Sequence, residues 1–405
     1  MTQKAVLAFS GGLDTSFCVP YLKERGYDVV TVFVNTGGFS DDEARAIGAR
    51  ARKLGALRHY AVDAQEDIYR QIVGPLIRAN GMYQDAYPNM CADRYVIVQK
   101  CVEVAKREKT NIVAHGCTGM GNDQVRFDVS IRALGDYEIV APIRDFQKTV
   151  PTGLRQKEAE YLTAKGFPIA AAHRIYSINQ NVLGVTISGS EIDDRKEPAE
   201  SAFTLTRAPE KAPARPERIR IGFERGLPVS LNGRRSPGIE ILRKLNILGG
   251  LHGVGRHLYT GDCIVGIKGR IAFECPGLHC LIAAHRALEE MTLSKEQNQF
   301  KAVIGKKWAE LVYSGLYYDP LLRDLERHLE SSQAFVTGEV TLKLYKGSAS
   351  VIARTSPNSL YNMDLVTFEE GAVAYDHHDA EGFIRLNGLR LKTYAARRMK
   401  LDGKA

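Results

Sequence analysis

The chain lacks a run of about 18 consecutive apolar residues, which a membrane-spanning helix needs, so no membrane span is expected. The apolar stretch after Met1 is also too short for a signal peptide. The sequence has no Cys-x-x-Cys pair and no internal repeat. Its cysteines number seven, an odd count that favours reduced thiols in a cytoplasmic protein over disulfides or a zinc site.

Extremes of composition are absent as well, since 44% of the 405 residues are hydrophobic and 25% are charged. These values exclude a disordered chain, a collagen-like repeat and a coiled coil, and the length predicts two or three domains. The net charge of +8 raises the question of a nucleic-acid partner. However, residues 385–405 hold seven basic side chains against Asp402 alone. The basic excess therefore belongs mainly to this C-terminal segment, and nucleic acid is not the expected partner.

Strand and helix signals alternate through the first 168 residues. Short apolar or β-branched runs predict the strands, and capped or periodic segments predict the helices. Strands are expected at 4–9, 28–34, 57–62, 111–115 and 138–142. The first helix is expected to end at residue 25, and further helices are expected at 40–54, 65–79 (kinked at Pro75), 91–108, 122–134 and 152–165. This order predicts an α/β domain with a doubly wound parallel sheet, which binds ligands at the carboxyl ends of its strands.

The pattern changes after residue 168. A proline-rich stretch at 195–220 predicts a linker or surface loop. Alternation at 219–223 and 227–231 around the turn 224–226 predicts a hairpin. Further strands are expected at 265–273, 336–345 and 349–353, and helices at 238–248 and 295–314. We therefore expect a nucleotide-binding domain at 1–168, an α+β domain at 169–378 and a helical arm at 379–405.

The strongest motif is Ser10-Gly11-Gly12-Leu13-Asp14-Thr15-Ser16, between the first strand and the first helix. Glycines let a ligand approach the backbone, and the free N–H groups of a helix N-terminus attract anions. There is no G-x-x-x-x-G-K-[ST] and no G-x-G-x-x-G in this turn, so a Walker-type loop is excluded and a dinucleotide fold is disfavoured. An ordinary strand-to-helix turn remains the alternative. An acidic Asp14 beside a phosphate either holds a metal ion or shapes the turn.

A second glycine-rich turn follows a later strand and also opens a helix. It reads His115-Gly-Cys-Thr-Gly-Met-Gly-Asn-Asp-Gln-Val-Arg-Phe127. Asn122 and Arg126 are four residues apart and share one helix face, where a guanidinium can bind a carboxylate or ureido group. A capped surface helix with a solvated arginine is the alternative. Two such turns in one sheet favour a single shared ligand cleft.

The first loop resembles the pyrophosphate loop of N-type ATP pyrophosphatases, and the second resembles the signature of the argininosuccinate synthase family. Further similar stretches follow in the family's order and cover nearly the whole chain: Asp85-Ala-Tyr-Pro88, His252-Gly-Val-Gly-Arg256, Trp308-Ala-Glu-Leu-Val-Tyr-Ser-Gly315, Ser356-Pro-Asn-Ser-Leu-Tyr361 and Gly382-Phe-Ile-Arg-Leu-Asn-Gly-Leu-Arg-Leu391. The resemblance implies an ATP-dependent ligase of arginine biosynthesis. It would join citrulline and aspartate through a citrullyl-adenylate and release AMP and pyrophosphate, with Mg²⁺ on the phosphates.

Roles carried over by position are implied by the resemblance alone. ATP would be bound by Ala8, Ser10, Gly11, Gly12, Asp14, Thr15, Ser16, Val34 and Gly116. Aspartate would be bound by Thr118, Asn122 and Asp123, and citrulline by Tyr87, Cys91, Asn122, Arg126, Ser177, Thr186, Asp262 and Phe273. Asp14, Asp123 and Arg126 are the expected catalytic residues. No protein-held metal site is expected.

Several positions depart from the family pattern. Met120 stands where many relatives have lysine, and a segment one residue shorter after Pro88 places Cys91 at a citrulline-contacting serine. Gly261 falls where a glutamate is expected, and Phe273 where a tyrosine is expected. The neighbours Asp262 and Glu274 are the candidate substitutes. The resemblance therefore implies a divergent branch, or a modified citrulline or another ureido or amide substrate.

Two other classes of function stay open at this stage. A tRNA-modifying adenylating enzyme, such as a thiouridine synthase, would share the pyrophosphate loop and use reactive cysteines such as Cys91, Cys101 or Cys117. A non-catalytic adenine-nucleotide-binding module would need only the two loops. In the family the C-terminal arm embraces neighbouring subunits, so the resemblance implies a homotetramer.

Overall fold

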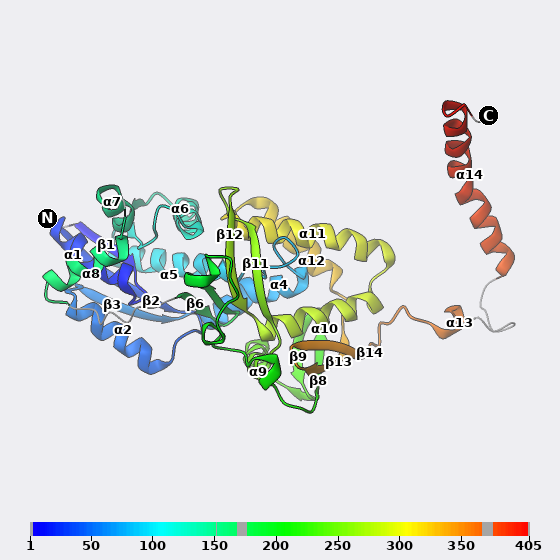
Figure 1. The fold of residues 1–405 in the computed structure, drawn as a ribbon, viewed down its shortest axis with the longest axis horizontal. Coiled ribbons are helices and arrows are strands. Elements are labelled where there is room, and N and C mark those ends of the chain that lie inside the picture. The colour runs from blue at the N-terminus through cyan, green and yellow to red at the C-terminus, as the bar shows by residue number, and fades with distance from the viewer. Residues whose placement is uncertain (1–2, 151, 168–175, 367–375, 404–405) are drawn as a thin grey trace. The chain divides into compact units, whose positions relative to one another are not determined.

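The computed structural model describes residues 3–150, 152–167, 176–366 and 376–403, and the expected domain limit at 168/169 lies outside these ranges. The chain divides into two compact units, Met1–Asn358 and Ser359–Ala405. The first unit holds three sheets and the helices around them (Figure 1).

The N-terminal sheet is five-stranded and parallel, in the order β3-β2-β1-β4-β5. Its strands are β1 (Gln3–Ala8), β2 (Tyr27–Asn35), β3 (Arg58–Asp63), β4 (Ile112–Ala114) and β5 (Glu138–Val140). The order runs outward from β1 in one direction to β3 and then resumes on the other side of β1 at β4. The doubly wound sheet is thus confirmed, and its switch point lies between β1 and β4.

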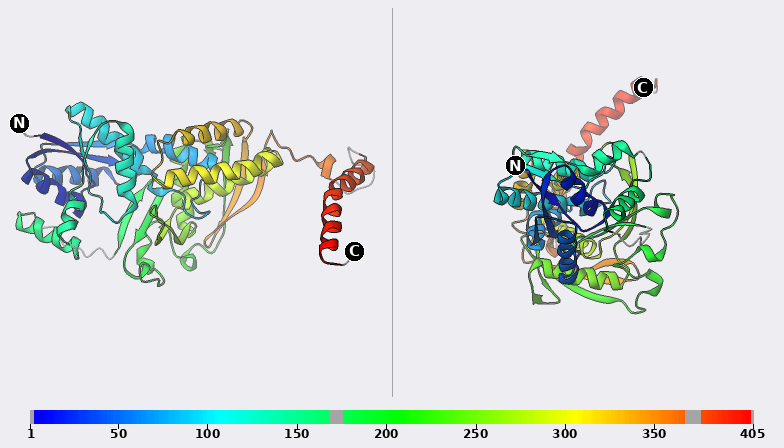
Figure 2. Two further views of the ribbon diagram at one scale, coloured as in Figure 1. Left: turned by 90° about the horizontal axis from the view of Figure 1, so that it is seen from above. Right: turned by 90° about the vertical axis from the view of Figure 1, so that its left-hand side faces the viewer.

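Helices cover both faces of this sheet (Figure 2). Leu7 and Phe9 pack with α1 (Leu13–Glu24), α2 (Asp41–Lys53) and α8 (Leu154–Ala164) in one core cluster. Val6 and Ala8 point to the opposite face, into the core that contains α4 (Gly74–Ala79) and α5 (Asp93–Glu108). Alternate residues of β1 therefore serve different cores, as expected for a strand that is buried on both sides.

Two predictions in this domain are refined by the structure. The helix expected at 65–79 is confirmed in its span, but it consists of α3 (Gln65–Ile68), the π-helical turn η1 (Tyr69–Val73) and α4 in succession, because Pro75 has no N–H to donate and the wide turn precedes it. The strand expected at 138–142 ends at Val140, since Pro142 opens an unpredicted helix, α7 (Pro142–Thr149). The short turn η2 (Met90–Ala92) precedes α5, and α6 (Asn122–Leu134) has the predicted bounds.

Two antiparallel sheets follow. One has the order β10-β9-β8-β13-β14 and contains β8 (Glu217–Glu224), β9 (Leu227–Leu231), β10 (Arg234–Arg235), β13 (Gly338–Tyr345) and β14 (Ser348–Thr355). The other has the order β11-β12-β7-β6 and contains β6 (Ser177–Asn181), β7 (Gly184–Ser188), β11 (Arg256–Asp262) and β12 (Lys268–Glu274). The predicted hairpin is confirmed: Arg225 and Gly226 both have positive φ, as a two-residue turn requires.

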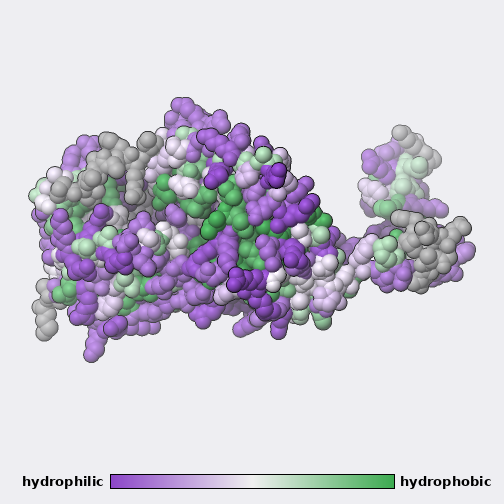
Figure 3. Space-filling model, turned by 90° about the horizontal axis from the view of Figure 1, so that it is seen from below, coloured by the Kyte–Doolittle hydropathy of each residue, from purple (hydrophilic) through white to green (hydrophobic). Residues whose placement is uncertain are grey.

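The remaining elements of this unit are helical. They are η3 (Ser190–Ile192), η4 (Glu200–Ala202), η5 (Pro209–Lys211), α9 (Gly238–Leu251), α10 (Pro276–Thr292), α11 (Lys295–Tyr313) and α12 (Pro320–Ser332). Hydrophobic side chains also gather in the middle of one face of the unit (Figure 3).

The second unit contains α13 (Met363–Val366) and α14 (His377–Leu401). Asp376 caps α14, because the Asp376 side chain accepts a hydrogen bond from the His378 N–H. Large apolar side chains of this helix are exposed: Phe383, Ile384, Leu386, Leu389, Leu391, Tyr394, Met399 and Leu401. In the described part of the chain, no helix is both long enough and apolar enough to cross a membrane.

Candidate active site

The first glycine-rich loop leaves its hydrogen-bond donors open. Gly11 has a φ of +74°, and a Cβ there would lie 2.9 Å from Cγ1 of Ile47. Gly12 is the N-cap of α1 and supplies no capping side chain, so the first N–H groups of the helix have no side-chain acceptor from the cap. Ser10 and Thr15 approach each other, with their hydroxyl oxygens 3.2 Å apart. This open set of donors is suited to a phosphate.

The second loop meets the first one at the switch point. A Cβ on Gly116 would lie 3.1 Å from Cγ2 of Thr15, so the two loops are in close contact and a larger residue at 116 would crowd Thr15. Ala8 ends β1, and Val34 lies next to the carboxyl end of the adjacent β2. Ser16 is fully buried and donates to the Gly11 carbonyl at 3.5 Å, which makes it a support of the loop. The other residues predicted to bind ATP belong to the first loop itself, so they lie at the same carboxyl edge of the sheet.

A buried histidine anchors the second loop. His115 accepts a hydrogen bond from the Cys117 N–H on Nδ1, so its Nε2 carries the proton that it donates to Asp128, 2.8 Å away. Arg144 of α7 donates to the other carboxylate oxygen of Asp128 at 2.9 Å. On the same helix, Gln147 accepts from the Gly119 N–H at 3.0 Å. The unpredicted helix α7 therefore holds the loop in place.

The polar face of α6 is held in place by partners from within the protein. Asp123 accepts from Arg94 at 3.0 Å and from Arg126 at 2.8 Å. Burial alone would raise the pKa of Asp123, but these two guanidinium groups hold it below its usual value. Arg126 is 2% exposed and also donates twice to the Tyr313 carbonyl, at 3.1 and 2.9 Å. Each of its terminal nitrogens keeps one further N–H for a ligand.

Asn122 connects this face to the second half of the chain. Its amide nitrogen donates to the Tyr313 hydroxyl at 3.2 Å, and its amide oxygen accepts from the Ile264 N–H at 3.0 Å. Thr118 belongs to the same turn, since its hydroxyl oxygen lies 3.6 Å from the point where a Cβ on Gly121 would be. The predicted aspartate-binding residues are thus brought together at the start of α6. Met120 is 82% exposed and joins none of these contacts.

A group of aromatic rings lies near the guanidinium group of Arg126. Tyr87 is buried, and its ring meets those of Phe273 at 5.4 Å and Tyr313 at 6.1 Å between centroids. Burial raises the pKa of Tyr87, which also hydrogen-bonds to Thr186 and contacts Cys91. Ser177 starts β6, which pairs with the β7 strand that carries Thr186. Most of the predicted citrulline residues therefore lie near one another.

The expected substitutes for the missing glutamate and tyrosine are engaged elsewhere. Asp262 accepts a hydrogen bond from Gln84 and pairs with Lys268 at 2.6 Å. Glu274 is fully buried and accepts from the N–H groups of residues 204–206, so it anchors that segment. At Gly261, a Cβ would lie 1.8 Å from the Tyr259 hydroxyl oxygen. The ring of Tyr259 therefore fills the space beside Gly261.

The cysteines argue against thiolation chemistry. All seven are free thiols. Burial raises the pKa values of Cys91 and Cys117 and raises that of Cys101 to about 12. A thiol that stays protonated is a weak nucleophile. In the described residues, no group of three or more His, Cys, Asp or Glu side chains could hold a metal ion.

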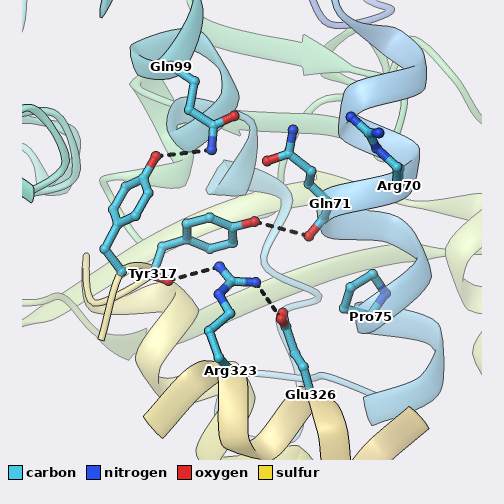
Figure 4. A pocket seen from close by; sticks show the side chains of 8 residues that line it. Arg70, Gln71, Pro75, Gln99, Tyr317, Arg323 and Glu326 are labelled. Carbon is cyan, nitrogen blue, oxygen red and sulfur yellow. Dashed lines mark hydrogen bonds and ion pairs between the residues drawn. The ribbon is translucent and has the colours of Figure 1, made fainter. Parts of the chain in front are cut away.

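A hollow of about 450 Å³ elsewhere contains none of the predicted site residues. Its two guanidinium groups already have partners. Arg323 donates to Glu326 and to the Tyr317 carbonyl (Figure 4). Arg70 pairs with Asp67. Gln99 donates to Tyr318 at 3.1 Å on the opposite wall. These pairings leave the hollow without a free charged group for a ligand.

Several residues of the site were missed by reading the sequence. Arg94, Tyr259 and Tyr313 come from three distant segments and meet the predicted residues only after folding. The adjacent charges Asp93 and Arg94 at the start of a buried helix were the one local signal. Glu158 of α8 was also missed, because only the structure shows that its carboxyl group is fully buried beside Asp14.

An α/β domain with a parallel five-stranded sheet and an open anion loop at its switch point defines a nucleotide-binding protein. The arginosuccinate synthase N-terminal HUP domain matches residues 4–168, and the arginosuccinate synthase C-terminal domain matches residues 176–394. The chain therefore belongs to the argininosuccinate synthase family of ATP-dependent carbon–nitrogen ligases, whose known reaction joins citrulline and aspartate.

Full-length relatives agree with this assignment. The argininosuccinate synthase of Xanthomonas axonopodis pv. citri is 49% identical over 395 residues, which cover 97% of this chain and 95% of that protein. The enzyme of Pyrococcus furiosus is 44% identical, with 96% and 93% covered. That of Methanocaldococcus jannaschii is 39% identical, with 99% and 100% covered. A match through the C-terminal domain decides against both a tRNA-modifying enzyme and a bare nucleotide-binding module.

Proposed function

We propose that the cleft between the two glycine-rich loops binds ATP and that the neighbouring face of α6 binds citrulline and aspartate. The observation that carries this proposal is the approach of Gly116 to Thr15, which joins the two loops into one site. The N-terminal N–H groups of α1, with Ser10 and Thr15, would bind the phosphates. Val34 would meet the adenine through its backbone.

The reaction has two steps. The ureido oxygen of citrulline forms a bond to the α-phosphorus of ATP, and the bond from that phosphorus to the pyrophosphate oxygen breaks. The amine of aspartate then forms a bond to the activated carbon, loses a proton and displaces AMP. Both steps depend on positioning and charge neutralisation.

The polar face of α6 is suited to positioning both amino acids. The Asp123 carboxylate would accept from the ammonium group of aspartate, with Thr118 and Asn122 beside it. Arg126 would donate its two remaining N–H groups to citrulline. Tyr87, Cys91, Ser177, Thr186 and Phe273 would surround the citrulline side chain.

We propose that Mg²⁺ arrives with ATP. Mg²⁺ commonly binds substrate phosphates and water with few protein ligands. The described residues fit this mode, because they contain no cluster that could hold the ion by itself. When bound, the ion would neutralise charge on the pyrophosphate leaving group.

The citrulline pocket is divergent at Gly261. We propose that the Tyr259 hydroxyl, which hydrogen-bonds to Gln84, takes over the polar contact that a glutamate side chain would make from position 261. Asp262 is a poorer substitute, since Gln84 and Lys268 already occupy its carboxylate.

We also propose a cytoplasmic homotetramer. Seven free thiols favour a reducing compartment. The exposed apolar side chains of α14 favour a helix that packs on another subunit. Sedimentation as a 44.8 kDa monomer at assay concentration would contradict the assembly.

The decisive experiment measures pyrophosphate release with ATP and aspartate, with and without citrulline. Release that requires citrulline, with AMP and argininosuccinate formed in equal amounts, would support the proposal. Release that requires a different ureido compound would show that the divergent pocket has changed the substrate.

A further inference from the structure

Beneath the first glycine-rich loop lies a carboxyl group that the reaction leaves unused. Glu158 of α8 is 0% exposed, and neither of its carboxyl oxygens has a hydrogen-bond donor among the described residues. Helix α8 packs against α1, with the ring centroids of Tyr161 and Phe17 4.8 Å apart, and the carboxyl group of Asp14 in the first turn of α1 acts on Glu158. Two ionised carboxylates in this position would repel each other and the phosphates of ATP.

The surroundings of Glu158 contain little to balance a second negative charge. Asp14 and the Cys18 thiol face it from α1, and burial keeps that thiol protonated by raising its pKa. Arg155 acts on it from its own helix, but the Arg155 side chain is exposed. Burial and the negative charge of Asp14 raise the pKa of Glu158 to about 9. At neutral pH the pair therefore holds one proton.

We propose that Glu158 is a positioning residue of the nucleotide site, a neutral acid whose O–H group donates a hydrogen bond to the Asp14 carboxylate. The pair then presents one negative charge instead of two to the phosphates, and the hydrogen bond holds the Asp14 side chain at the start of α1. This inference rests on the proposed binding of ATP at the loop.

The test compares the dissociation constant of ATP at pH 7 and pH 10 in wild type, Glu158→Gln and the control Glu160→Gln. Glu160 lies on the same helix, is exposed and pairs with Lys157 at 2.7 Å. Ionisation of Glu158 adds a charge near the phosphates, so we expect ATP binding by wild type to weaken by about tenfold or more over this range. Glutamine keeps the hydrogen bond and cannot ionise, so the Glu158→Gln protein should lose that extra weakening and match wild type at pH 7. Glu160→Gln should behave as wild type.

A second measurement does not depend on ATP. The infrared spectrum of wild type at pH 7 should contain the band of a buried protonated carboxylic acid, which Glu158→Gln should lack. Absence of that band, or identical pH profiles in wild type and Glu158→Gln, would overturn the inference. Binding of Mg²⁺ alone that is lost in Glu158→Gln would overturn it in favour of a metal site. If wild type at pH 7 fails to bind ATP, it is the proposed function that fails.

Discussion

The two glycine-rich turns both connect a strand of the parallel sheet to a helix, but they differ in the polar groups that they present. The turn after β1 leaves the start of α1 without a side-chain cap, and the hydroxyls of Ser10 and Thr15 lie 3.2 Å apart there. The helix after β4 presents Asn122, Asp123 and Arg126, and each already has partners in distant segments. The first turn has donors suited to a phosphate, whereas the helix after the second turn belongs to a connected polar network.

We propose that this difference reflects how each ligand is recognised. A phosphate needs a cluster of donors, which a short peptide segment supplies by itself. An amino acid carries an ammonium, a carboxylate and a side chain, so its binding groups must come from several elements. We therefore expect substitutions in the network to affect stability and catalysis together, and substitutions in the first turn to affect nucleotide binding more selectively.

The largest effect is expected for Arg126→Ala. It removes the donor to Asp123 and to the Tyr313 carbonyl, so kcat/KM should fall by about 100-fold or more. Stability should also fall by about 3 kcal/mol, because buried partners lose their pairing. Steady-state kinetics and urea unfolding test this. Arg132→Ala, an exposed change on the same helix, is the control, and wild-type kinetics in both variants would refute the assignment.

Next comes Gly11→Ala, compared with Gly26→Ala. Both glycines have positive φ, so both changes should cost about 1 kcal/mol of stability. A Cβ at Gly11 would press on Ile47, whereas a Cβ at Gly26 meets nothing within 4 Å. ATP affinity, measured by calorimetry, should therefore fall by about tenfold in Gly11→Ala only. Equal affinities in the two variants would show that the loop does not bind ATP.

A smaller effect is expected at the divergent pocket. Gly261→Glu should raise the KM for citrulline by about fivefold, because the new side chain must displace the Tyr259 ring. Adding Tyr259→Ala should relieve this crowding and lower the KM again. Gly266→Glu, in the open turn of the same hairpin, is the control. An unchanged KM in Gly261→Glu would place this position outside the citrulline site.

A separate effect, on the pH dependence of stability and not on substrate binding, is expected at Glu158. The unfolded glutamate ionises above about pH 4.5, whereas the folded one keeps its proton until about pH 9. The folded state therefore loses up to about 1.4 kcal/mol relative to the unfolded state for each pH unit in that window. Glu158→Gln should remove this slope, so its stability advantage over wild type should be larger at pH 8 than at pH 6. Denaturant titrations at both values test this, and parallel curves would contradict it.

Reading the sequence located the strands of the parallel sheet and both glycine-rich turns, because hydrophobic runs and local turn chemistry are properties of neighbouring residues. It missed α7, since Pro142 was read as the end of a strand when it begins a helix. It also missed β11, α10 and α12 in the second half, where helices and strands follow no simple alternation.

By itself, the sequence determined the family and the two loops, and it supplied the residues that we propose bind ATP. Only the tertiary structure decided which groups remain available to ligands. The sequence shows only that Asp262 and Glu274 are acidic. In the folded protein Asp262 pairs with Lys268, and Glu274 accepts hydrogen bonds from residues 204–206. Glu158 carries no local signal, and the role proposed for it rests on its burial beside Asp14. The physical reason is that pairing and desolvation depend on contacts between segments far apart in the chain.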